Sequence, residues 1–351
     1  MTDPLTSLPR WAYTAILSAL MLGGVCVLGP LTPLQQAPVP QGSPSSGSRE
    51  RTLLFVGDMM LSRGVGASMK VKGDWTYPFR EIAETSRAAD LTYGNLECPI
   101  SDQGRDLHHL YSFRADPRAL EGLRQAGFRV VSQANNHAYD WGPSALLDGL
   151  RRLRAADIRT VGAGQNELEA HYPVIVDLDG LKLAFLAYAN IEPREATAEV
   201  DRPGVAWLDL DQVLADIRFA RPLADLLVVC PHWGDEYAAR PTREQVKLAQ
   251  KMIDAGADLI VGSHPHVVQP LEQYHGGWIA YSLGNFVFDQ KKPATRRGVM
   301  LRVTVRDKWI GGVTLIPITI NPNYQAVLAR PAEQVSKAQL VSRDPRMPRA
   351  Q

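Results

Sequence analysis

A repeated pairing of an amphipathic helix with a short β-branched strand constrains the fold of this chain more than any other feature. In each unit a helical segment ends at a Gly or Asp turn, and an apolar strand that ends in polar residues follows. The pairs are PRALEGLRQAG with FRVVSQ, ALLDGLRRLRAAD with IRTVGAG, VLADIRFARPLAD with LLVVC, and REQVKLAQKMIDAGAD with LIVGS. Helices that alternate with strands are typical of an α/β domain in which helices cover a sheet.

The pattern changes after Gly298. Residues 299–320 (VMLRVTVRDKWIGGVTLIPITI) alternate with a period of two on both sides of Gly311-Gly312. This alternation predicts antiparallel strands joined by a turn at the two glycines. Antiparallel strands beside helix–strand units favour a mixed sheet, or two sheets, over an all-parallel one.

Composition excludes several classes of protein. The chain has 351 residues, 45% of them hydrophobic, which is enough for one large or two modest domains and excludes a disordered chain. Since 38 Lys and Arg residues almost balance 37 Asp and Glu residues, no overall field would attract nucleic acid, and any polyanion must be bound locally. The three cysteines, Cys26, Cys98 and Cys230, exclude a disulfide framework or a thiolate zinc cluster. Metal chemistry must therefore use His, Asp, Glu and Asn.

The N-terminal part is expected to lie outside the folded domain. Residues 11–31 carry no charge and as a helix are long enough to cross a bilayer, so they form a membrane anchor or a signal peptide. Arg10 precedes this segment and no small-residue cleavage site follows it, which favours an uncleaved single-pass anchor with the domain outside the cytoplasm. Cleavage would instead give a secreted protein.

The predicted organisation is an anchor or signal segment over 1–31, a Pro/Ser-rich linker over 32–50, a folded domain over 51–330 and a tail over 331–351.

Polar residues that could perform chemistry come directly after the strands. They are Gly57-Asp58, Gly94 to Glu97, Asn135 to His137, His232 to Glu236, and Ser263 to His266. The carboxyl ends of strands form the ligand crevice in open α/β sheets, so these five ends are expected to converge. Each motif alone also fits a turn or a helix cap, but together one Asp, one Glu, one Asn and three His predict a two-metal cage of oxygen and nitrogen ligands. His108, His109, His171 and His275 are expected at the surface.

These motifs also occur in a specific combination and order. They are GNLE (94–97), NNHAYDWG (135–142), HWGDEY (232–237), SHPHVVQP (263–270) and YSLGNFVFDQ (281–290). Over about residues 52–290 the chain resembles the CapA-type capsule or poly-γ-glutamate synthesis proteins. That family is similar to the calcineurin-like metallophosphatases, so the resemblance implies an α/β fold of two mixed β-sheets packed together and flanked by helices (α/β/β/α).

The resemblance also implies roles for individual residues. Asp58 and His266 would bind the first metal, Glu97 would bridge, and the second metal would be held by Asn136, His232 and His264. His137 would protonate the leaving group. The cofactor is then one or two divalent ions such as Mn, Fe or Zn.

The sequence departs from the metallophosphatase pattern at two positions. Met59 and Met60 stand after Asp58 where an Asp-x-His motif is expected, and Glu97 replaces the usual bridging Asp. A weakened first site and a single-metal site both remain open. Asn285 could cap a turn or touch the site, and Glu236 could support a ligand or begin a helix. Cys98 and Cys230 are expected to be buried free thiols, with binding of a soft ion or mutual pairing as the alternatives.

Two functions fit these features. In the first, the chain is a metal-dependent hydrolase of a phosphoester or γ-glutamyl bond, in which Asp140 orients His137 as the proton donor. In the second, it is a non-catalytic accessory subunit of a membrane synthesis complex that binds an anionic polymer such as poly-γ-glutamate. Both assign the membrane and other subunits of the complex as partners, and neither involves nucleic acid.

Overall fold

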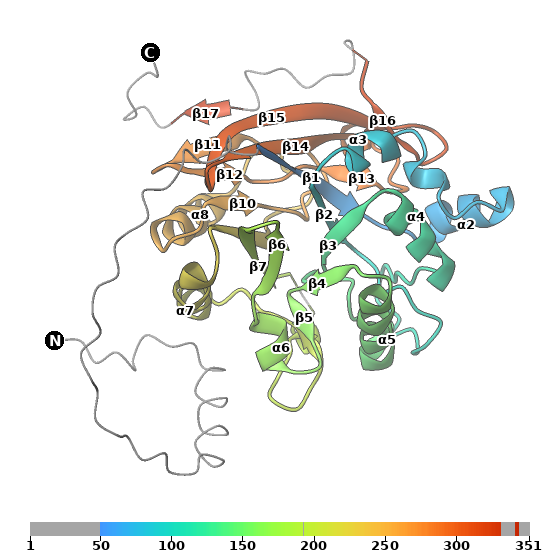
Figure 1. The fold of residues 1–351 in the computed structure, drawn as a ribbon. Coiled ribbons are helices and arrows are strands. Elements are labelled where there is room, and N and C mark those ends of the chain that lie inside the picture. Colours follow the sequence, from blue (N-terminus) through green and yellow to red (C-terminus); the bar gives the residue numbers. More distant parts are fainter. Residues whose placement is uncertain (1–49, 192, 331–340, 344–351) are drawn as a thin grey trace, which may run out of the picture.

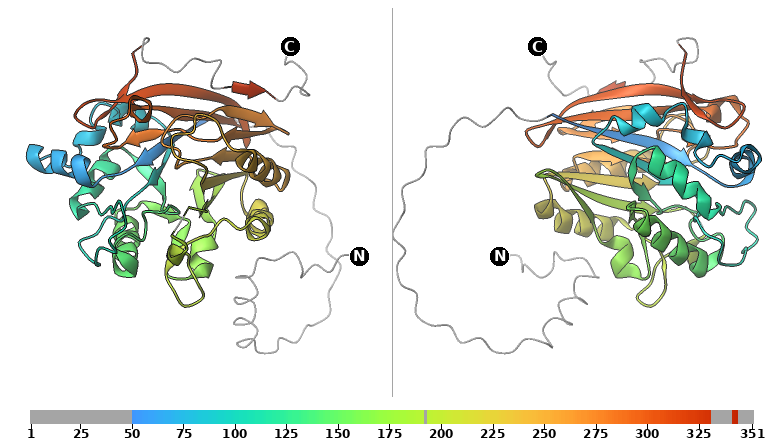
Figure 2. Two further views of the ribbon diagram at one scale, coloured as in Figure 1. Left: turned by 180° about the vertical axis from the view of Figure 1, so that it is seen from behind. Right: turned by 45° about the vertical axis from the view of Figure 1, so that its right-hand side comes forward.

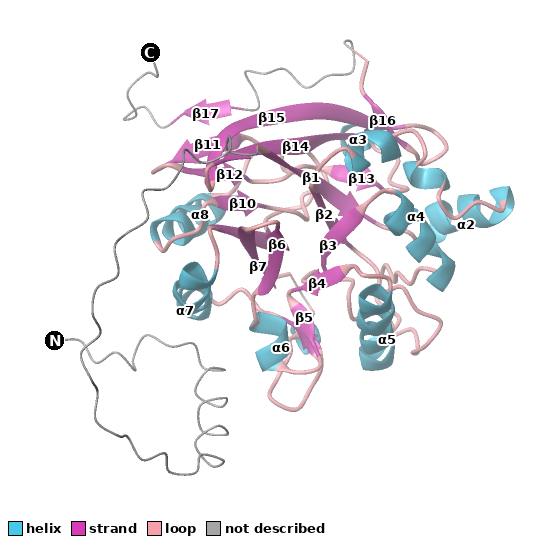
Figure 3. Cartoon of the chain, viewed as in Figure 1, coloured by secondary structure: helices cyan, strands magenta, loops and turns pink. Residues whose placement is uncertain are grey.

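The computed structural model describes residues 50–191, 193–330 and 341–343. Two mixed β-sheets pack face to face, and helices cover both outer faces (Figures 1 and 3). The turned views of Figure 2 show the same layers from other directions. This arrangement confirms the predicted α/β/β/α architecture.

The first sheet contains eight strands in the order β16-β15-β14-β1-β2-β3-β4, with β13 paired to the end of β1. Strands β1 to β4 and β13 are mutually parallel. β14 pairs antiparallel with β1, and β15 and β16 each pair antiparallel with the strand before them. Their bounds are β1 (Arg51–Met59), β2 (Leu91–Leu96), β3 (Phe128–Ser132), β4 (Arg159–Val161), β13 (Asn285–Val287), β14 (Arg297–Arg306), β15 (Trp309–Ile320) and β16 (Ala326–Leu328).

The second sheet contains seven strands in the order β17-β11-β12-β10-β9-β7-β6. Strands β7, β9, β10 and β12 are mutually parallel, and β6 and β11 run against them. Their bounds are β6 (Val174–Leu178), β7 (Leu181–Ala189), β9 (Leu226–His232), β10 (Leu259–Val261), β11 (Leu271–Tyr274), β12 (Gly277–Ala280) and β17 (Val341–Arg343). A small ribbon joins β5 (Ala163–Gly164) and β8 (Gly204–Val205).

The helices divide between the two faces (Figure 1). Those of the first half are α2 (Arg63–Lys72), α3 (Ala83–Arg87), α4 (Leu120–Gln125) and α5 (Gly142–Ala155). Those of the second half are α6 (Glu167–His171), α7 (Leu210–Ala220) and α8 (Arg243–Asp254). Short 3₁₀ helices are η2 (Tyr77–Phe79), η3 (Pro117–Ala119), η4 (Arg194–Ala196), η5 (Arg221–Leu223) and η6 (Pro293–Arg296). A capping box between Thr242 and Gln245 fixes the start of α8.

Side chains along the strands point alternately to the two faces of each sheet, and both sets are buried in the core. Leu53 and Phe55 of β1 face the layer between the sheets, and Leu54 and Val56 face the helices. In the same way Val228 of β9 points between the sheets while its neighbours pack under α7 and α8. Both sheets are thus buried on two faces, which explains why their central strands are apolar throughout.

The predicted hairpin after Gly298 forms, but the prediction of a Gly-Gly turn is wrong. The turn is Asp307-Lys308, whose φ angles are 47° and 69°, and Arg306 pairs with Trp309 across it. Gly311 and Gly312 instead lie inside β15. Asp tolerates the left-handed conformation that a two-residue hairpin requires, and pairing of β14 with β1 fixes the register.

The expected anchor (1–31) and linker (32–50) lie outside the described residues except for Glu50, and most of the expected tail (331–351) does as well. Within the tail, Val341–Arg343 pair as β17 with β11. Within the described ranges, no helix combines the length and the apolar character needed to cross a membrane.

Candidate functional site

The polar residues that follow the strands gather at one edge of the sheet sandwich. Asp58 lies at the end of β1, Glu97 directly follows β2, and His232 is the last residue of β9. Asn136 and His137 follow β3, and His264 and His266 follow β10. The structure therefore brings all six predicted metal ligands and the predicted proton donor together, as the shared direction of these strands requires.

Two buried carboxylates form the centre of the site. Asn95 Nδ2 donates to Asp58 Oδ1 (2.9 Å) and to Glu97 Oε1 (3.1 Å), and so holds the two acids together. Asp58 Oδ2 accepts a long hydrogen bond from the backbone N–H of His264 (3.3 Å) and lies 3.3 Å from His266 Nδ1. The prediction from sequence missed Asn95, although it stands two residues before Glu97 on the same face of β2.

Gly57 explains how Asp58 reaches this position. A Cβ atom at Gly57 would lie 1.8 Å from the carbonyl oxygen of Gly284, so only glycine allows this close approach. The next residue uses the proximity, because the Asp58 N–H donates to the same Gly284 oxygen at 3.0 Å. The Gly-Asp pair is therefore needed to join β1 to the segment that begins β13.

His232 connects the two halves of the site. Its Nε2 lies 2.9 Å from Asn136 Oδ1, and its Nδ1 lies 2.9 Å from Ser263 Oγ and 4.0 Å from Glu97 Oε1. Ser263 was predicted only as part of the His264 motif. Since Nε2 faces an acceptor oxygen, the arrangement corresponds to a proton on Nε2 and a lone pair on Nδ1.

His264 and His266 adopt left-handed backbone conformations, with φ angles of 96° and 59°. Such conformations are costly for residues other than glycine and are concentrated at functional sites. His266 Nδ1 lies 2.9 Å from Asn285 Oδ1, whose amide nitrogen donates to Gln290 Oε1 and to the carbonyl of Thr295. Asn285 therefore touches the site and orients the ring of His266, which is one of the two roles that the sequence left open.

Burial and charge set the protonation of these groups. The pKa of Glu97 is raised well above its usual value, mainly by burial and secondly by the negative charge of Asp58. Burial, followed by His264 and His266, lowers the pKa of His232 well below its usual value. Burial also lowers the pKa of His264 to about 3, with His266 as the next cause. The imidazoles of His232 and His264 are thus neutral near pH 7, which is the form that binds metals.

The donor set fits a divalent cation. One atom each of Asp58, Glu97 and His232 can be chosen so that all three lie within 4.8 Å of one another. Glu97 Oε2 and His264 Nδ1 are buried without a hydrogen-bond partner, although such atoms are nearly always satisfied. A cation would give both atoms a partner and would offset two adjacent buried carboxylates. The structure therefore supports divalent metal binding at this site.

The departure after Asp58 has a clear structural consequence. Met59 and Met60 are completely buried in the cluster under α2 and η2 and supply no ligand. The side of the site formed by Asp58 thus relies on His266 and Glu97 alone among the predicted ligands. The weakened first site and the single-metal site both stay predictions.

His137 lies beside the carboxylate and histidine cluster. Its Nδ1 is 2.8 Å from Asp140 Oδ2, and its Nε2 is 3.2 Å from Asn136 Nδ2. Its ring packs on Phe113 with centroids 3.9 Å apart, and 11% of its side chain remains exposed while Asp140 is fully buried. His137 is therefore held firmly and still reaches solvent.

His109 also belongs to this part of the site. Its Nδ1 lies 3.3 Å from the second oxygen of Asp140, too poorly aligned for a hydrogen bond, so its prediction as a simple surface residue missed this contact. The surface prediction for His171 is wrong, because that ring is buried against Tyr188 and bonded to Asp216. Both partners are distant in sequence, so no local pattern indicates them.

Two further expectations concern the cysteines and Glu236. Cys98 and Cys230 are confirmed as buried free thiols, and burial raises the pKa of each to about 12, which keeps both protonated. Glu236 lies exposed in the loop after β9 and does not begin a helix, because α8 starts at Arg243.

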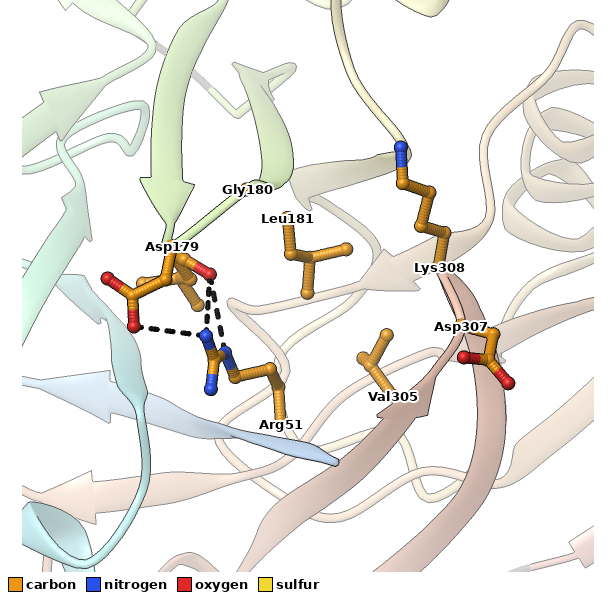
Figure 4. A pocket seen from close by; sticks show the side chains of 8 residues that line it. Arg51, Asp179, Gly180, Leu181, Val305, Asp307 and Lys308 are labelled. Carbon is orange, nitrogen blue, oxygen red and sulfur yellow. Dashed lines mark hydrogen bonds and ion pairs between the residues drawn. The ribbon is translucent and has the colours of Figure 1, made fainter. Parts of the chain in front are cut away.

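A separate hollow of about 200 Å³ lies at the opposite end of β1 from Asp58 (Figure 4). Arg51 donates there to the carbonyl of Leu178 and to Asp179. The hollow lies at the Arg51 end of β1, so it is separate from the candidate metal centre at the Asp58 end.

Comparison with known proteins points to the part of the chain that contains the site. Residues 52–290 match the family described as bacterial capsule synthesis protein PGA_cap. The chain is 34% identical to "Capsule biosynthesis protein CapA" of Bacillus anthracis over 281 residues, 77% of this chain and 67% of the relative. It is 31% identical to "Probable polyglutamine synthesis accessory protein MT0602" of Mycobacterium tuberculosis over 290 residues, 77% of this chain and 74% of the relative. The solved calcineurin-like phosphoesterase YfkN of Bacillus subtilis aligns over 82% of this chain and 94% of its own, with a TM-score of 0.43 and 15% identity.

Proposed function

This chain belongs to the bacterial capsule synthesis protein PGA_cap family, and from this premise we propose that it is a metal-dependent hydrolase of capsule or poly-γ-glutamate synthesis or export. The bond cleaved is a phosphoester or a γ-glutamyl amide. The His137–Asp140 pair beside the Asp58, Glu97 and His232 cluster is the observation that carries the proposal. A site that only binds needs metal ligands and no proton donor. General acid catalysis needs, in addition, a histidine that is fixed in position beside the ligands.

The metal centre is built from the six ligands already described. Asp58, Glu97, Asn136, His232, His264 and His266 would hold one or two divalent ions. When bound, a divalent ion polarises the scissile phosphoester or amide and lowers the pKa of water toward neutrality. Asn95, Ser263 and Asn285 would keep the ligands in position, as outer hydrogen-bond partners do in other metal sites.

His137 supplies the proton. Asp140 accepts from Nδ1 at 2.8 Å, which fixes the orientation of the ring. Nε2 lies on the other side of the ring, 3.2 Å from Asn136 Nδ2 and beside the ligands. From there a protonated Nε2 would donate to the oxygen or nitrogen of the leaving group. Phe113 covers the ring and limits its rotation.

The alternative is a metal-dependent polymer-binding accessory subunit without turnover. Met59 and Met60 in place of a ligand favour it, because a first site with fewer ligands is less suited to two-metal catalysis. The word "accessory" in the name of the mycobacterial relative points the same way. Both functions place the domain outside the cytoplasm, held by residues 1–31.

The deciding experiment is a hydrolysis screen on the full chain purified in detergent. Aryl phosphates, phosphodiesters and γ-glutamyl peptides are incubated with the protein before and after removal of metal by a chelator. Metal-dependent cleavage of any of them supports the hydrolase. Polymer binding that needs the metal, without cleavage of any substrate, supports the accessory subunit instead.

A further inference from the structure

We propose that a basic groove beside the metal centre binds successive carboxylates of an anionic polymer and guides it toward the site. The basic groove is formed by η6 and its flanks together with the ends of β15 and β16, and its polar lining is Lys291, Arg296, Arg297, Thr319, Asn321 and Arg330. Its volume of about 560 Å³ lies within the usual range for ligand pockets. The inference rests on the proposed function in taking a glutamate polymer as the occupant.

Positive charge is concentrated along this groove. The seven-residue segment KKPATRR (291–297) carries four cations, of which Lys291, Arg296 and Arg297 line the groove, and no Asp or Glu lines it among the described residues. The adjacent acid, Asp289, is bound to Arg63 and to the backbone of Gly64. Lys291 and Arg297 are exposed and form no ion pair within the described part of the chain.

A second arginine-rich hollow shows the opposite arrangement. A hollow of about 800 Å³ between η3, α4 and α5 is also rich in arginine. There each cation has a carboxylate partner: Arg118 pairs with Asp116, Arg124 with Glu121, and Arg151 and Arg152 with Asp148. Since the chain as a whole is almost neutral, the basic groove is a local concentration of positive charge rather than part of a general basic surface.

Hydrogen bonds connect the basic groove to the metal centre. Asn285 accepts from His266 through Oδ1 and donates through Nδ2 to the carbonyl of Thr295, inside η6. Lys292 Nζ lies 3.5 Å from the ring centroid of Tyr237, and that ring lies 6.3 Å from His266. One short segment therefore carries cations toward the groove and toward the ligands.

A polymer of carboxylates fits these features better than a single small anion. The cations are long, exposed and spread along a groove, so each contact is weak and salt-sensitive, and affinity requires several contacts at once. Repeating glutamyl carboxylates supply those contacts, and the amides between them can bond to Thr319 and Asn321.

The test is direct binding of poly-γ-glutamate to the full chain in detergent, measured by fluorescence anisotropy at low ionic strength. The variant Lys291→Gln/Arg297→Gln removes two exposed cations of the groove. The matched control Arg243→Gln/Lys247→Gln removes two exposed cations of α8 and changes the net charge equally. We expect the groove variant to bind the polymer roughly threefold to twentyfold more weakly, because it loses the combined binding free energy of two surface ion pairs. The control should bind the polymer as the parent does. Each single variant should show part of the loss, and circular dichroism verifies folding.

Several outcomes would overturn the inference. The first is that the parent does not bind the polymer, and the second is that the groove and control variants bind it equally well. The third is that the groove variant binds the polymer as the parent does but no longer binds phosphatidylglycerol vesicles, which would make the groove a membrane contact. The measurement needs no turnover. If the hydrolysis screen fails while the groove variant still loses binding, the proposed hydrolase fails and the groove stands. If hydrolysis is found but both variants bind the polymer equally, the groove fails and the hydrolase stands.

Discussion

At the scale of single residues, His137 separates the two functions proposed for the site. Replacing it by Asn removes the proton donor but none of the predicted ligands, so metal content and fold should be unchanged. We expect hydrolysis to fall by roughly 10² to 10⁴, and least for aryl phosphates, whose leaving groups depart without a proton. Rate measurements over a series of leaving groups check this. Unchanged rates on every cleaved substrate would make His137 a structural residue.

Glu97 and His264 each carry a buried side-chain atom without a hydrogen-bond partner, and these two atoms define a second prediction. The changes Glu97→Gln and His264→Ala should each weaken metal binding at least roughly tenfold, because each removes a ligand from a small set. His275→Ala is the matched control, since that histidine is exposed and bonded to Asp254. Metal analysis after dialysis against a buffered metal concentration gives the comparison. Full metal content in both site variants would remove the proposed centre.

The buried histidines also predict how stability depends on pH. The pKa of His264 is lowered from 6.5 to about 3, and that of His232 is lowered as well, so the unfolded chain binds protons more readily than the folded one. The contribution of these two histidines to the stability of the metal-free protein should therefore be greatest above pH 6.5 and fall as the pH drops toward 3. Each histidine contributes up to about 1.4 kcal/mol per pH unit.

Glu97 changes stability with pH in the opposite direction, because burial raises its pKa. Its contribution to the free energy of unfolding is present below pH 4.5 and is lost as the pH rises toward the raised pKa. The variant His264→Gln isolates the histidine contribution. Urea unfolding of metal-free protein between pH 7 and 5 should give a shallower pH dependence for this variant than for the parent. Identical slopes would contradict a neutral, buried His264.

At the scale of elements, the hairpin between β14 and β15 gives a test of its register. Asp307 occupies the left-handed region with φ of 47°, where a β-branched side chain is strained. Asp307→Val should cost about 1 to 2 kcal/mol in the free energy of unfolding, and Asp307→Gly should be neutral or stabilising. Gly312→Thr should also be tolerated, because a Cβ there meets no atom within 4 Å.

Urea unfolding of these three variants distinguishes the two possible turns. If Gly312→Thr is the damaging change and Asp307→Val is harmless, then the turn lies at the glycines after all. The same experiment tests the sheet order, since β14 joins the hairpin to β1 and thus to Asp58.

At the scale of the whole molecule, the proposed anchoring by residues 1–31 predicts on which side of a membrane the domain would lie. Arg10 precedes the uncharged segment 11–31, so we expect the N-terminus in the cytoplasm and the domain outside it. A reporter that is active only outside the cytoplasm, fused after Glu50, should be active. A reporter that works only in the cytoplasm should be inactive at the same position. The reverse pair of results would reject the proposed orientation.

Sequence alone determined the fold class and the chemical groups of the site. The periods of 3.6 and 2 are local, so the helix–strand units and the β14–β15 hairpin can be read from neighbouring residues. Polar residues at strand ends are local too, which is why Asp58, Glu97, Asn136, His137, His232, His264 and His266 were all identified before the structure.

Tertiary structure alone decided how these groups meet. The N–H of His264 reaches Asp58 across 206 positions of chain, and His232 reaches Asn136 across 96. No periodicity reports such contacts, because they depend on which strands become neighbours and on how far each extends. The same cause hid the bridging role of Asn95, the burial of His171 against Asp216, and the shift of the hairpin turn to Asp307-Lys308. Local patterns specify elements, whereas the packing of the two sheets specifies partners.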